Sequence, residues 1–497
     1  MGPPSTHTSQ LTSDTADVVV IGAGFGGIGA ALTLAEQGQR VALFESLRYP
    51  GGCASTFEKG GAHYETGATL FSGLHPDGLF GRWRQTHALD VDFVFPEVPI
   101  TLRTPDLDLP IYRDRARFIA SLAALPGAPV DAIHRFFAEQ GRVAEALWPI
   151  LDDANRLMPF GPGALMWHLR RLPLYLPLLR HIGRPALRLL ERHDLAQFAP
   201  LRTWVDANSQ ITVQVDAAQA EAPFALSTMD YIFRGTGHVH GGIGALATAL
   251  VGAIEKAGGQ VHMPARVRRI EQTPDGYIVH ARNRRIRTRQ VVANLLPEAL
   301  SGLLDEPGAR LRRLQASVDA GWSACMLYLQ LQPSADLPSG PFHLELINDA
   351  DSPFVDGNHI FVSVSASDEK RGPDGVRTAT VSTHVRPEAL REAPAAQVEA
   401  VQARMMRTLA RLAPEVDQTI VHRLTASPRT WQRFTRRPRG LVGGVPRTVG
   451  LHNYRQITPT ALKRGLWLVG DSVFPGQSTL ATALGGAATA RALLRSV

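Results

Sequence analysis

The stretch DVVVIGAGFGGIGAALTLAEQGQRVALFE (residues 17–45) decides the fold that we expect for this chain. It opens with a short β-branched run, passes through a glycine-rich turn into a helical segment, and ends on a second strand. β-Branched runs are typical of buried strands, and a glycine after the helical segment ends it. The order strand, turn, helix, strand predicts an α/β unit that binds a dinucleotide at the turn.

Three glycines of the turn have different tasks in such a site. Gly22 permits the tight turn, Gly24 lets the backbone approach a pyrophosphate, and Gly27 lets the helix lie close to the strand. The first turn of the helix offers free N–H groups and the positive end of its dipole to the phosphates. Glu45, about 20 residues past the turn, is expected to accept hydrogen bonds from the adenosine ribose hydroxyls.

Two more glycine-containing turns follow the second strand. The segment RYPGGCAS (residues 48–55) places Gly51 and Gly52 where a backbone loop can pass close to further phosphate or ribityl groups. The segment GGAHYETGAT (residues 60–69) provides another strand and turn. A plain hairpin would explain either segment alone. The indication of a cofactor site therefore comes from the order in which both segments follow the first motif.

In this order the motifs resemble the FAD-dependent carotenoid desaturase and isomerase (phytoene desaturase-like) family. Its wider group holds amine oxidases, retinol saturase and the GDP dissociation inhibitors. The resemblance rests on Gly22, Glu45, the pair Gly51-Gly52 and the turn that begins at Gly67. It implies an α/β fold: a Rossmann-like FAD-binding domain of the amine oxidase and GDP dissociation inhibitor kind, with an interleaved α+β substrate domain.

The C-terminal segment is similar to the motif that closes the flavin site in this family. GLWLVGD (residues 465–471) reads as a strand that ends in Gly-Asp, and residues 472–477 lead into a helix of small residues. The Asp471 carboxylate can bind a ribityl hydroxyl. A helix that begins near Gln477 would direct its N–H groups at the flavin pyrimidine carbonyl. The segment SPRTWQRFTRRPRGLVGGVP (residues 427–446) is most similar to the bacterial carotenoid 3,4-desaturase branch.

We therefore expect FAD as cofactor and expect no metal. The two cysteines, Cys53 and Cys325, stand in no metal-ligand spacing. The residues expected to contact FAD are Gly22, Gly24, Phe25, Gly26, Gly27, Glu45, Ser46, Gly51, Gly52, Cys53, Ala54, Ser55, Gly67, Ala68, Thr69, Val267, Gly470, Asp471, Pro475, Gly476, Gln477, Ser478 and Thr479.

The chain of 497 residues is too long for a single small module. We expect a flexible N-terminus over residues 1–16 and an FAD-binding domain in three pieces, residues 17–90, 234–300 and 457–497. The substrate domain then takes residues 91–233 and 301–456. Alternating segments at 323–331 and 380–385 predict a mixed sheet there, and residues 395–412 predict an amphipathic helix.

A net charge of +7 would suit nucleic acid, an anionic membrane surface or an acidic substrate. No nucleic-acid module accompanies it, so we expect no nucleic-acid partner. Residues 164–195 interleave leucines and aromatics with arginines and prolines, which favours short helices that lie on a membrane surface. A solvated helical lid over the core is the alternative. We expect a cytoplasmic protein, peripherally bound to the inner membrane.

His238 and His240 are the titratable pair that a flavin or substrate could meet. In an extended His-x-His segment both rings share a face, so both are candidate catalytic residues. Structural turn histidines are the competing interpretation.

The predicted activity is desaturation of a carotenoid, a long lipophilic polyene, by hydride transfer to flavin N5. Reduced flavin would pass its electrons to a membrane quinone or to oxygen. The alternatives are a carotenoid cis-trans isomerase that uses reduced FAD, a reductase like retinol saturase, and a non-catalytic prenyl-lipid carrier. An amine oxidase would be expected to place an aromatic pair and a lysine at the flavin. The oligomeric state is left open.

Overall fold

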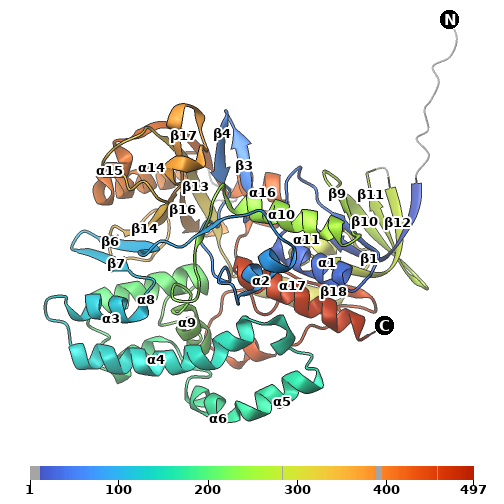
Figure 1. Ribbon diagram of the computed structural model, residues 1–497, viewed down its shortest axis with the longest axis horizontal. Helices are drawn as coiled ribbons and strands as arrows, with labels where there is room; N and C mark the ends of the chain where they lie inside the picture. The colour runs from blue at the N-terminus through green and yellow to red at the C-terminus, as the bar shows by residue number, and fades with distance from the viewer. Residues whose placement is uncertain (1–11, 283, 388–394, 456, 497) are drawn as a thin grey trace, which may run out of the picture.

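The protein is described by a computed structural model over residues 12–282, 284–387, 395–455 and 457–496. Two units, each built around one sheet, lie side by side along the long axis of the molecule (Figure 1). The chain passes between them several times, so that segments far apart in the sequence complete each unit. This interleaving brings the two ends of the described chain into the same unit.

The first sheet follows the predicted dinucleotide pattern. Its strands run in the order β10 (Val267–Thr273), β11 (Gly276–Ala281), β12 (Arg284–Ala293), β1 (Thr12–Ile21), β2 (Val41–Phe44) and β9 (Gln260–His262), and β18 (Leu466–Leu468) also pairs with β12. The pairings among β12, β1, β2, β9 and β18 are parallel. Their carboxyl ends therefore meet at one edge, where α/β sheets bind ligands.

Helices cover both faces of this sheet. On one face α1 (Phe25–Glu36), α10 (Ile243–Lys256) and α17 (Thr479–Leu494) share an apolar core with β1 and β2. On the other face lie α11 (Pro297–Ser301) and α12 (Ala309–Asp319). A Cβ on Gly486 of α17 would lie 2.1 Å from the Gly26 carbonyl oxygen of α1. The small residues expected in the last helix thus permit its close approach to the first.

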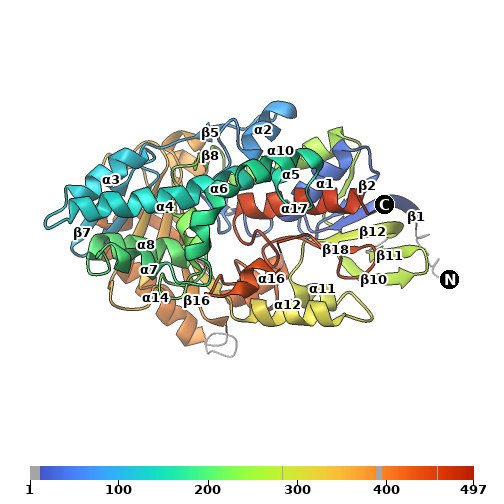
Figure 2. The same ribbon diagram turned by 90° about the horizontal axis from the view of Figure 1, so that it is seen from below.

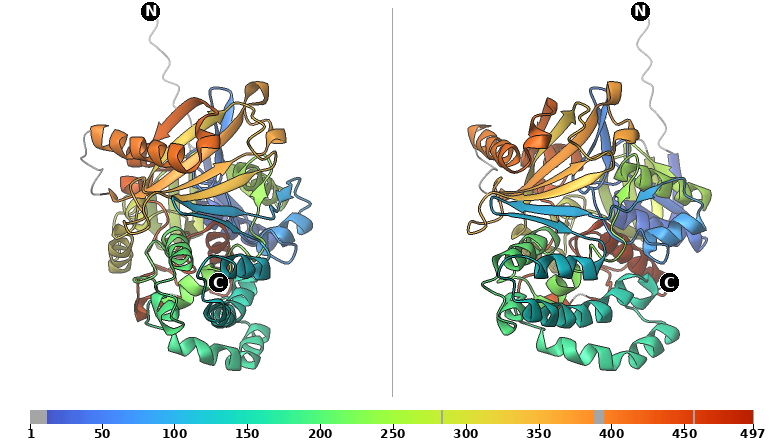
Figure 3. Two further views of the ribbon diagram at one scale, coloured as in Figure 1. Left: turned by 90° about the vertical axis from the view of Figure 1, so that its left-hand side faces the viewer. Right: turned by 60° about the vertical axis from the view of Figure 1, so that its left-hand side comes forward.

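The second sheet is mixed. Its order is β17 (Ile420–Ala426), β13 (Ser323–Leu331), β16 (Arg377–Val385), β15 (His359–Val364), β14 (Phe342–Ile347), β6 (Ile100–Thr104) and β7 (Leu107–Ile111), and only the β14–β6 pair is parallel. Helix α14 (Ala395–Leu412) packs Met405 and Leu409 on one face. Helix α8 (Ala199–Thr212) lies below the opposite face (Figure 3), so helices cover both faces.

A helical layer lies beneath the second sheet (Figure 1). Its helices are α3 (Arg115–Ala123), α4 (Val130–Leu151), α7 (Leu187–Arg192), α8 and α9 (Ala222–Thr228). The outermost helices lie below α4 in Figure 1 and in front of the molecule in Figure 2. They are α5 (Pro162–Arg170), α6 (Leu172–Tyr175) and the short helix η2 (Leu176–Arg180). Helix α5 has no buried residue.

Shorter elements complete the molecule. They are β3 (Thr56–Lys59), β4 (Ala62–Glu65), α2 (Leu79–Thr86), β5 (Phe93–Val94), η1 (Ala154–Arg156), β8 (His238–Val239), η3 (Ser367–Glu369), η4 (Pro373–Gly375), α15 (Pro414–Asp417), α16 (Pro428–Thr435), η5 (Pro438–Gly440) and η6 (Leu451–Tyr454). Helix α16 links the second sheet to the edge of the first, and it therefore sits at the boundary between the two units.

The structure corrects two of the expected boundaries. Residues 12–16 belong to β1, because the register Thr12↔Arg284 extends the parallel ladder with β12; residues 1–11 lie outside the described part. Helix α12 packs Leu311 and Leu314 on the first sheet, although residues 301–456 were expected in the substrate domain. Its apolar side covers a face of the parallel sheet that would otherwise meet water.

Candidate active site

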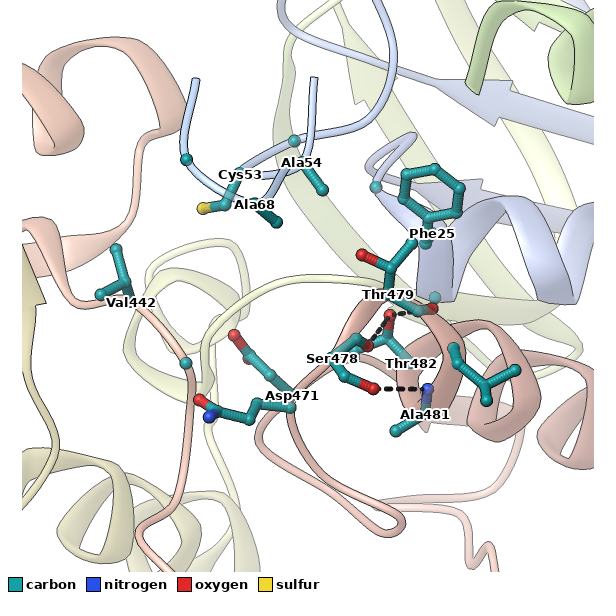
Figure 4. Close-up of a pocket in the computed structure, with 18 of the residues that line it drawn as sticks. Phe25, Cys53, Ala54, Ala68, Val442, Asp471, Ser478, Thr479, Ala481 and Thr482 are labelled. Carbon is teal, nitrogen blue, oxygen red and sulfur yellow. Dashed lines mark hydrogen bonds between the residues drawn. The ribbon is translucent and has the colours of Figure 1, made fainter. Parts of the chain in front are cut away.

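One cavity of about 930 Å³ runs from the carboxyl edge of the first sheet to the second sheet. Its first half is lined by the glycine turn after β1, the loop after β2, the Gly67 turn and the start of α17. Figure 4 shows that Phe25, Cys53 and Asp471, from three separate segments of the chain, surround one space, together with Ser478 from the same segment as Asp471. The parallel pairing explains this meeting, because it brings four strand ends to the same edge.

The glycine turn after β1 has the conformation that its sequence predicted. Gly22 has φ +96°, which L side chains rarely adopt, and its N–H donates to the Phe44 carbonyl at 2.7 Å. Asn294, directly after β12, lies against this turn, and a Cβ on Gly24 would come 2.7 Å from its Nδ2. The backbone is therefore bare where a phosphate group needs close approach.

The Glu45 carboxylate closes the turn from the next strand. Oε2 accepts the Ala23 N–H at 2.8 Å, while Oε1 accepts the Leu47 N–H at 2.8 Å and the Ser46 hydroxyl at 3.0 Å. A carboxylate has about four acceptor positions, so capacity is left for a ribose hydroxyl. Glu45 lines the cavity beside Val267, and the two residues lie at the same end as Ala265.

The Asp471 carboxylate faces the cavity at the end of β18 and has a cationic partner. Arg437 Nη2 donates to Asp471 Oδ2 at 2.6 Å, and both side chains are largely buried. Although burial lowers the pKa of Arg437, the Asp471 charge outweighs it and raises that pKa. The Arg437 guanidinium therefore stays charged and holds the carboxylate in place for a polyol hydroxyl.

The N-terminus of α17 also points into the cavity. The Ser478 hydroxyl caps the helix by accepting the Ala481 N–H at 3.0 Å, as the dashed line in Figure 4 shows. Ser478 has φ +103°, a strained conformation for a residue other than glycine. Gln477 is held by Gln214, whose Nε2 donates to its Oε1 at 2.7 Å. The helix dipole is thereby directed at a fixed point of the cavity.

Most of the residues predicted to contact FAD line this cavity, and three do not. A Cβ on Gly27 would lie 1.9 Å from the Gly22 carbonyl oxygen, so Gly27 serves the strand–helix contact. The Ser55 hydroxyl is buried and donates to the Gly52 carbonyl at 2.9 Å. Gly476 packs against the Arg447 guanidinium. These three residues shape the loops that line the cavity.

The two histidines predicted as catalytic lie outside the cavity lining. His238 is buried between the two units, where its Nε2 lies 2.8 Å from Glu369 Oε1. Arg371 joins that Glu369 to Glu65 at 3.0 Å. His240 instead is partly exposed, with its Nε2 3.6 Å from Asp368 Oδ1. The structure therefore does not bear out the prediction that both rings could meet the flavin or the substrate, because His238 is engaged by the buried Glu369 and Arg371 and His240 lies near the surface beside Asp368.

Sequence reasoning missed several residues of the cofactor half, among them the polar residues Asn294, Arg437 and Arg447. A signal existed for Asn294, since a polar residue directly after a buried strand lies at the carboxyl edge of a parallel sheet. Arg437 and Arg447 stand among many arginines of residues 427–447, and nothing local separates them from solvated ones. In the structure Arg447 differs from the solvated arginines by its burial, which lowers its pKa to about 10.

The second half of the cavity lies between the second sheet and the helical layer and is largely apolar. Its lining comes from β6, β7, β13, β14, β15, β16, α4, α8 and α9, and its apolar members include Ile100, Ile111, Met326, Trp148, Ile150, Trp204, Ile211 and Phe361. No lysine occurs among the described residues that line the cavity. These residues therefore do not form the site with a lysine at the flavin that was expected for an amine oxidase.

A family model for flavin-containing amine oxidoreductases matches residues 25–494. The chain belongs to this family. The predictions of a flavin enzyme, of FAD and of a Rossmann-like FAD-binding unit beside a substrate unit are confirmed. The bare glycine backbone, Glu45 and Asp471 in the first half of the cavity fit a dinucleotide.

Relatives within the family cover most or part of the chain. Prolycopene isomerase 2, chloroplastic, of an Oncidium hybrid cultivar is 26% identical over 95% of this chain and 82% of its own length. The neurosporene-forming phytoene desaturase of Rhodobacter capsulatus is 27% identical over 54% of this chain and 49% of its own. A Methanosarcina mazei oxidoreductase structure superposes with TM-score 0.65 at 17% identity, covering 96% of this chain and 99% of that one.

Proposed function

We propose that this flavoenzyme acts on a carotenoid and desaturates it. The observation that carries the proposal is the continuity of the cavity, whose apolar half opens directly into the cofactor half. A long polyene can lie along Ile100, Ile111 and Phe361 and place one allylic bond beside the cofactor. The names of the relatives support the same substrate class.

The chain contributes binding, orientation and the exclusion of water. Bound FAD supplies a two-electron acceptor that can take a hydride from an allylic carbon at N5. Asp471 and Glu45 would hold its hydroxyl-bearing groups, and the α17 N-terminus would stabilise negative charge that develops on the flavin. The apolar wall keeps solvent from an electron-poor polyene. The finer assignment to the 3,4-desaturase branch is part of this proposal.

Isomerisation is the second candidate function. The alignment with a prolycopene isomerase extends over 95% of the chain, which favours it. Both reactions need the same cavity and cofactor, and they differ in whether the substrate loses hydrogen. A reductase like retinol saturase would add hydrogen instead.

The test is anaerobic incubation of the FAD-loaded protein with phytoene, prolycopene and lycopene, with the flavin oxidised in one set and reduced beforehand with dithionite in a second set. The masses of the products are then determined. A product two hydrogens lighter supports desaturation, an equal mass with altered geometry supports isomerisation, and a product two hydrogens heavier supports saturation. The wild-type apoprotein, from which FAD has been removed, serves as the control. Absence of any product with all three polyenes would refute the proposed substrate class.

We further propose that the substrate enters from a membrane surface. Leu172, Leu176 and Leu179 of α6 and η2 are 52–65% exposed, and exposed arginines at 170, 180, 184 and 188 lie close to them in the chain. Apolar side chains beside arginines suit an anionic bilayer surface. No helix within the described ranges is long and apolar enough to cross a membrane. A cytoplasmic place at the inner membrane, with quinone or oxygen as electron acceptor, completes this proposal.

A further inference from the structure

A carboxylate and an imidazole form a buried pair in the apolar half of the cavity. Glu345 on β14 and His359 on β15 both line the cavity, and His359 Nε2 lies 3.1 Å from Glu345 Oε1. The two side chains are only 3% and 5% exposed. We propose that His359 is the proton acceptor of the desaturation and that Glu345 positions it. This inference rests on the proposed function.

The hydrogen bond to Glu345 decides which ring nitrogen of His359 is basic. A carboxylate is an acceptor only, so Nε2 carries the proton that it shares with Oε1. The neutral ring then has its lone pair on Nδ1. This is the arrangement in which a carboxylate holds a histidine in the tautomer that can take up a proton and stabilises the imidazolium that forms.

The other charged side chains that line the cavity differ from this pair in their position. Among the described residues that line it, the other carboxylates are Glu45, Glu298 and Asp471, and each belongs to the cofactor half or its rim. The arginines are already protonated. Beside the Glu345 carboxylate, the candidate proton acceptors that line the substrate half in the described part of the chain are therefore the imidazoles of His359 and His384.

His384 is the weaker candidate of these two. Gln210 Nε2 lies 3.4 Å from its Nδ1, and within the described residues its ring has no ion pair with a carboxylate like that of His359. Burial, followed by the charge of neighbouring His359, lowers the pKa of His384 to about 4. His359 in contrast has Glu345 beside it to balance the positive charge that protonation creates.

The step balances in atoms and electrons. Desaturation removes a hydride and a proton from two adjacent carbons, and the electron pair of the second C–H bond becomes the new C=C bond. The hydride goes to FAD, which is the oxidant of the proposed function, and the proton goes to His359 Nδ1. Isomerisation has no such proton loss, so the assignment applies to desaturation alone.

The energetics of burial support a functional role for the pair. Replacing a buried ion pair by apolar side chains of similar size is often neutral or stabilising. A wall that only had to contact a hydrocarbon would therefore need no charge, and neighbours such as Phe361 and Met326 have none. Among the described residues, the titratable side chains that interact with His359 are Glu345 on β14 and His384 on β16.

The test measures flavin reduction by stopped flow in the FAD-loaded protein without oxygen, with the polyene that the wild type desaturates, from pH 5 to pH 9. His359→Gln is expected to lower the rate about 100-fold or more, since general bases contribute that much. If a neutral His359 accepts the proton, the rate of the wild type should rise with pH, and His359→Gln should remove that rise. Glu345→Gln should lower the rate less and shift the profile, which a merely structural role would not do.

Flavin content and thermal unfolding of each variant show whether it folds. His87→Gln is the matched control, because His87 Nε2 lies 2.8 Å from Glu36 Oε1 in a similar pair outside the cavity. If wild type desaturates and both folded variants keep its rate and pH profile, the inference is wrong. If wild type desaturates none of the three polyenes, the proposed function fails, and the inference fails with it.

Discussion

Substitution of Gly22 by alanine tests whether the glycine turn is a cofactor cradle. At φ +96° an L residue is strained, and a left-handed conformation costs about 1–2 kcal/mol. The new Cβ would also lie 2.8 Å from the Asn294 carbonyl oxygen, a backbone atom that cannot turn away. Overpacking of this kind costs about 1–3 kcal/mol. The two contributions add up to about 2–5 kcal/mol. This energy destabilises the turn conformation that would bind the pyrophosphate.

A matched glycine separates the two contributions. Gly38 ends α1 with φ +73° and would carry a Cβ with nothing within 4 Å. Gly38→Ala therefore introduces the backbone strain without a steric clash, at a position outside the cavity lining. Both variants should unfold at lower temperature in a differential scanning measurement, with the larger shift in Gly22→Ala.

The decisive assay is flavin affinity, measured by absorbance and fluorescence titration of the apoprotein with FAD. A penalty of at least about 2 kcal/mol corresponds to about 30-fold weaker binding in Gly22→Ala. Gly38→Ala should bind FAD as the wild type does. Equal affinities in all three proteins would refute the reasoning that this turn approaches the cofactor.

Three further predictions address the assembly, the buried ion network and the outer helices. Removal of residues 466–497 deletes β18 and α17, so the purified protein should be colourless, and retained FAD absorbance would contradict the assembly. Burial raises the pKa of Glu369, but His238 and Arg371 outweigh it and hold that pKa at about 2, below the ordinary 4.5. Its stabilisation is complete above pH 4.5 and is lost as the pH falls toward 2, so Glu369→Gln should flatten that part of a urea-unfolding series. Replacing Leu176 and Leu179 by serine should weaken sedimentation with anionic liposomes about 10-fold or more, whereas Val421→Ser, an exposed site elsewhere, should not.

The cofactor half of the cavity was largely predictable from the sequence. Gly22, Gly24, Glu45 and Asp471 stand next to strand ends, and a strand followed by a glycine turn and a helix places its residues at one edge of a parallel sheet. Such requirements are local: a tight turn needs a positive φ, and a phosphate needs bare backbone. Gly27 and Ser55 differ because they support the loops rather than face the cavity.

The histidines show where local patterns fail. His238 and His240 stand in a suggestive segment, yet His238 joins an ion network with Glu369 and Arg371, which are more than a hundred residues away in the chain. His359 stands in an ordinary strand sequence and has no local mark. Its role depends on a partner that the sheet brings to it.

The sequence by itself determined that this chain forms a dinucleotide-binding α/β unit with FAD, because backbone conformation and strand ends are encoded over a few residues. Only the tertiary structure decided which charged groups meet. The register of β14 and β15 sets Glu345 beside His359, and the return of the chain at β18 sets Asp471 beside Arg437. Long-range pairing of this kind follows from sheet order and packing, which no single stretch of sequence specifies.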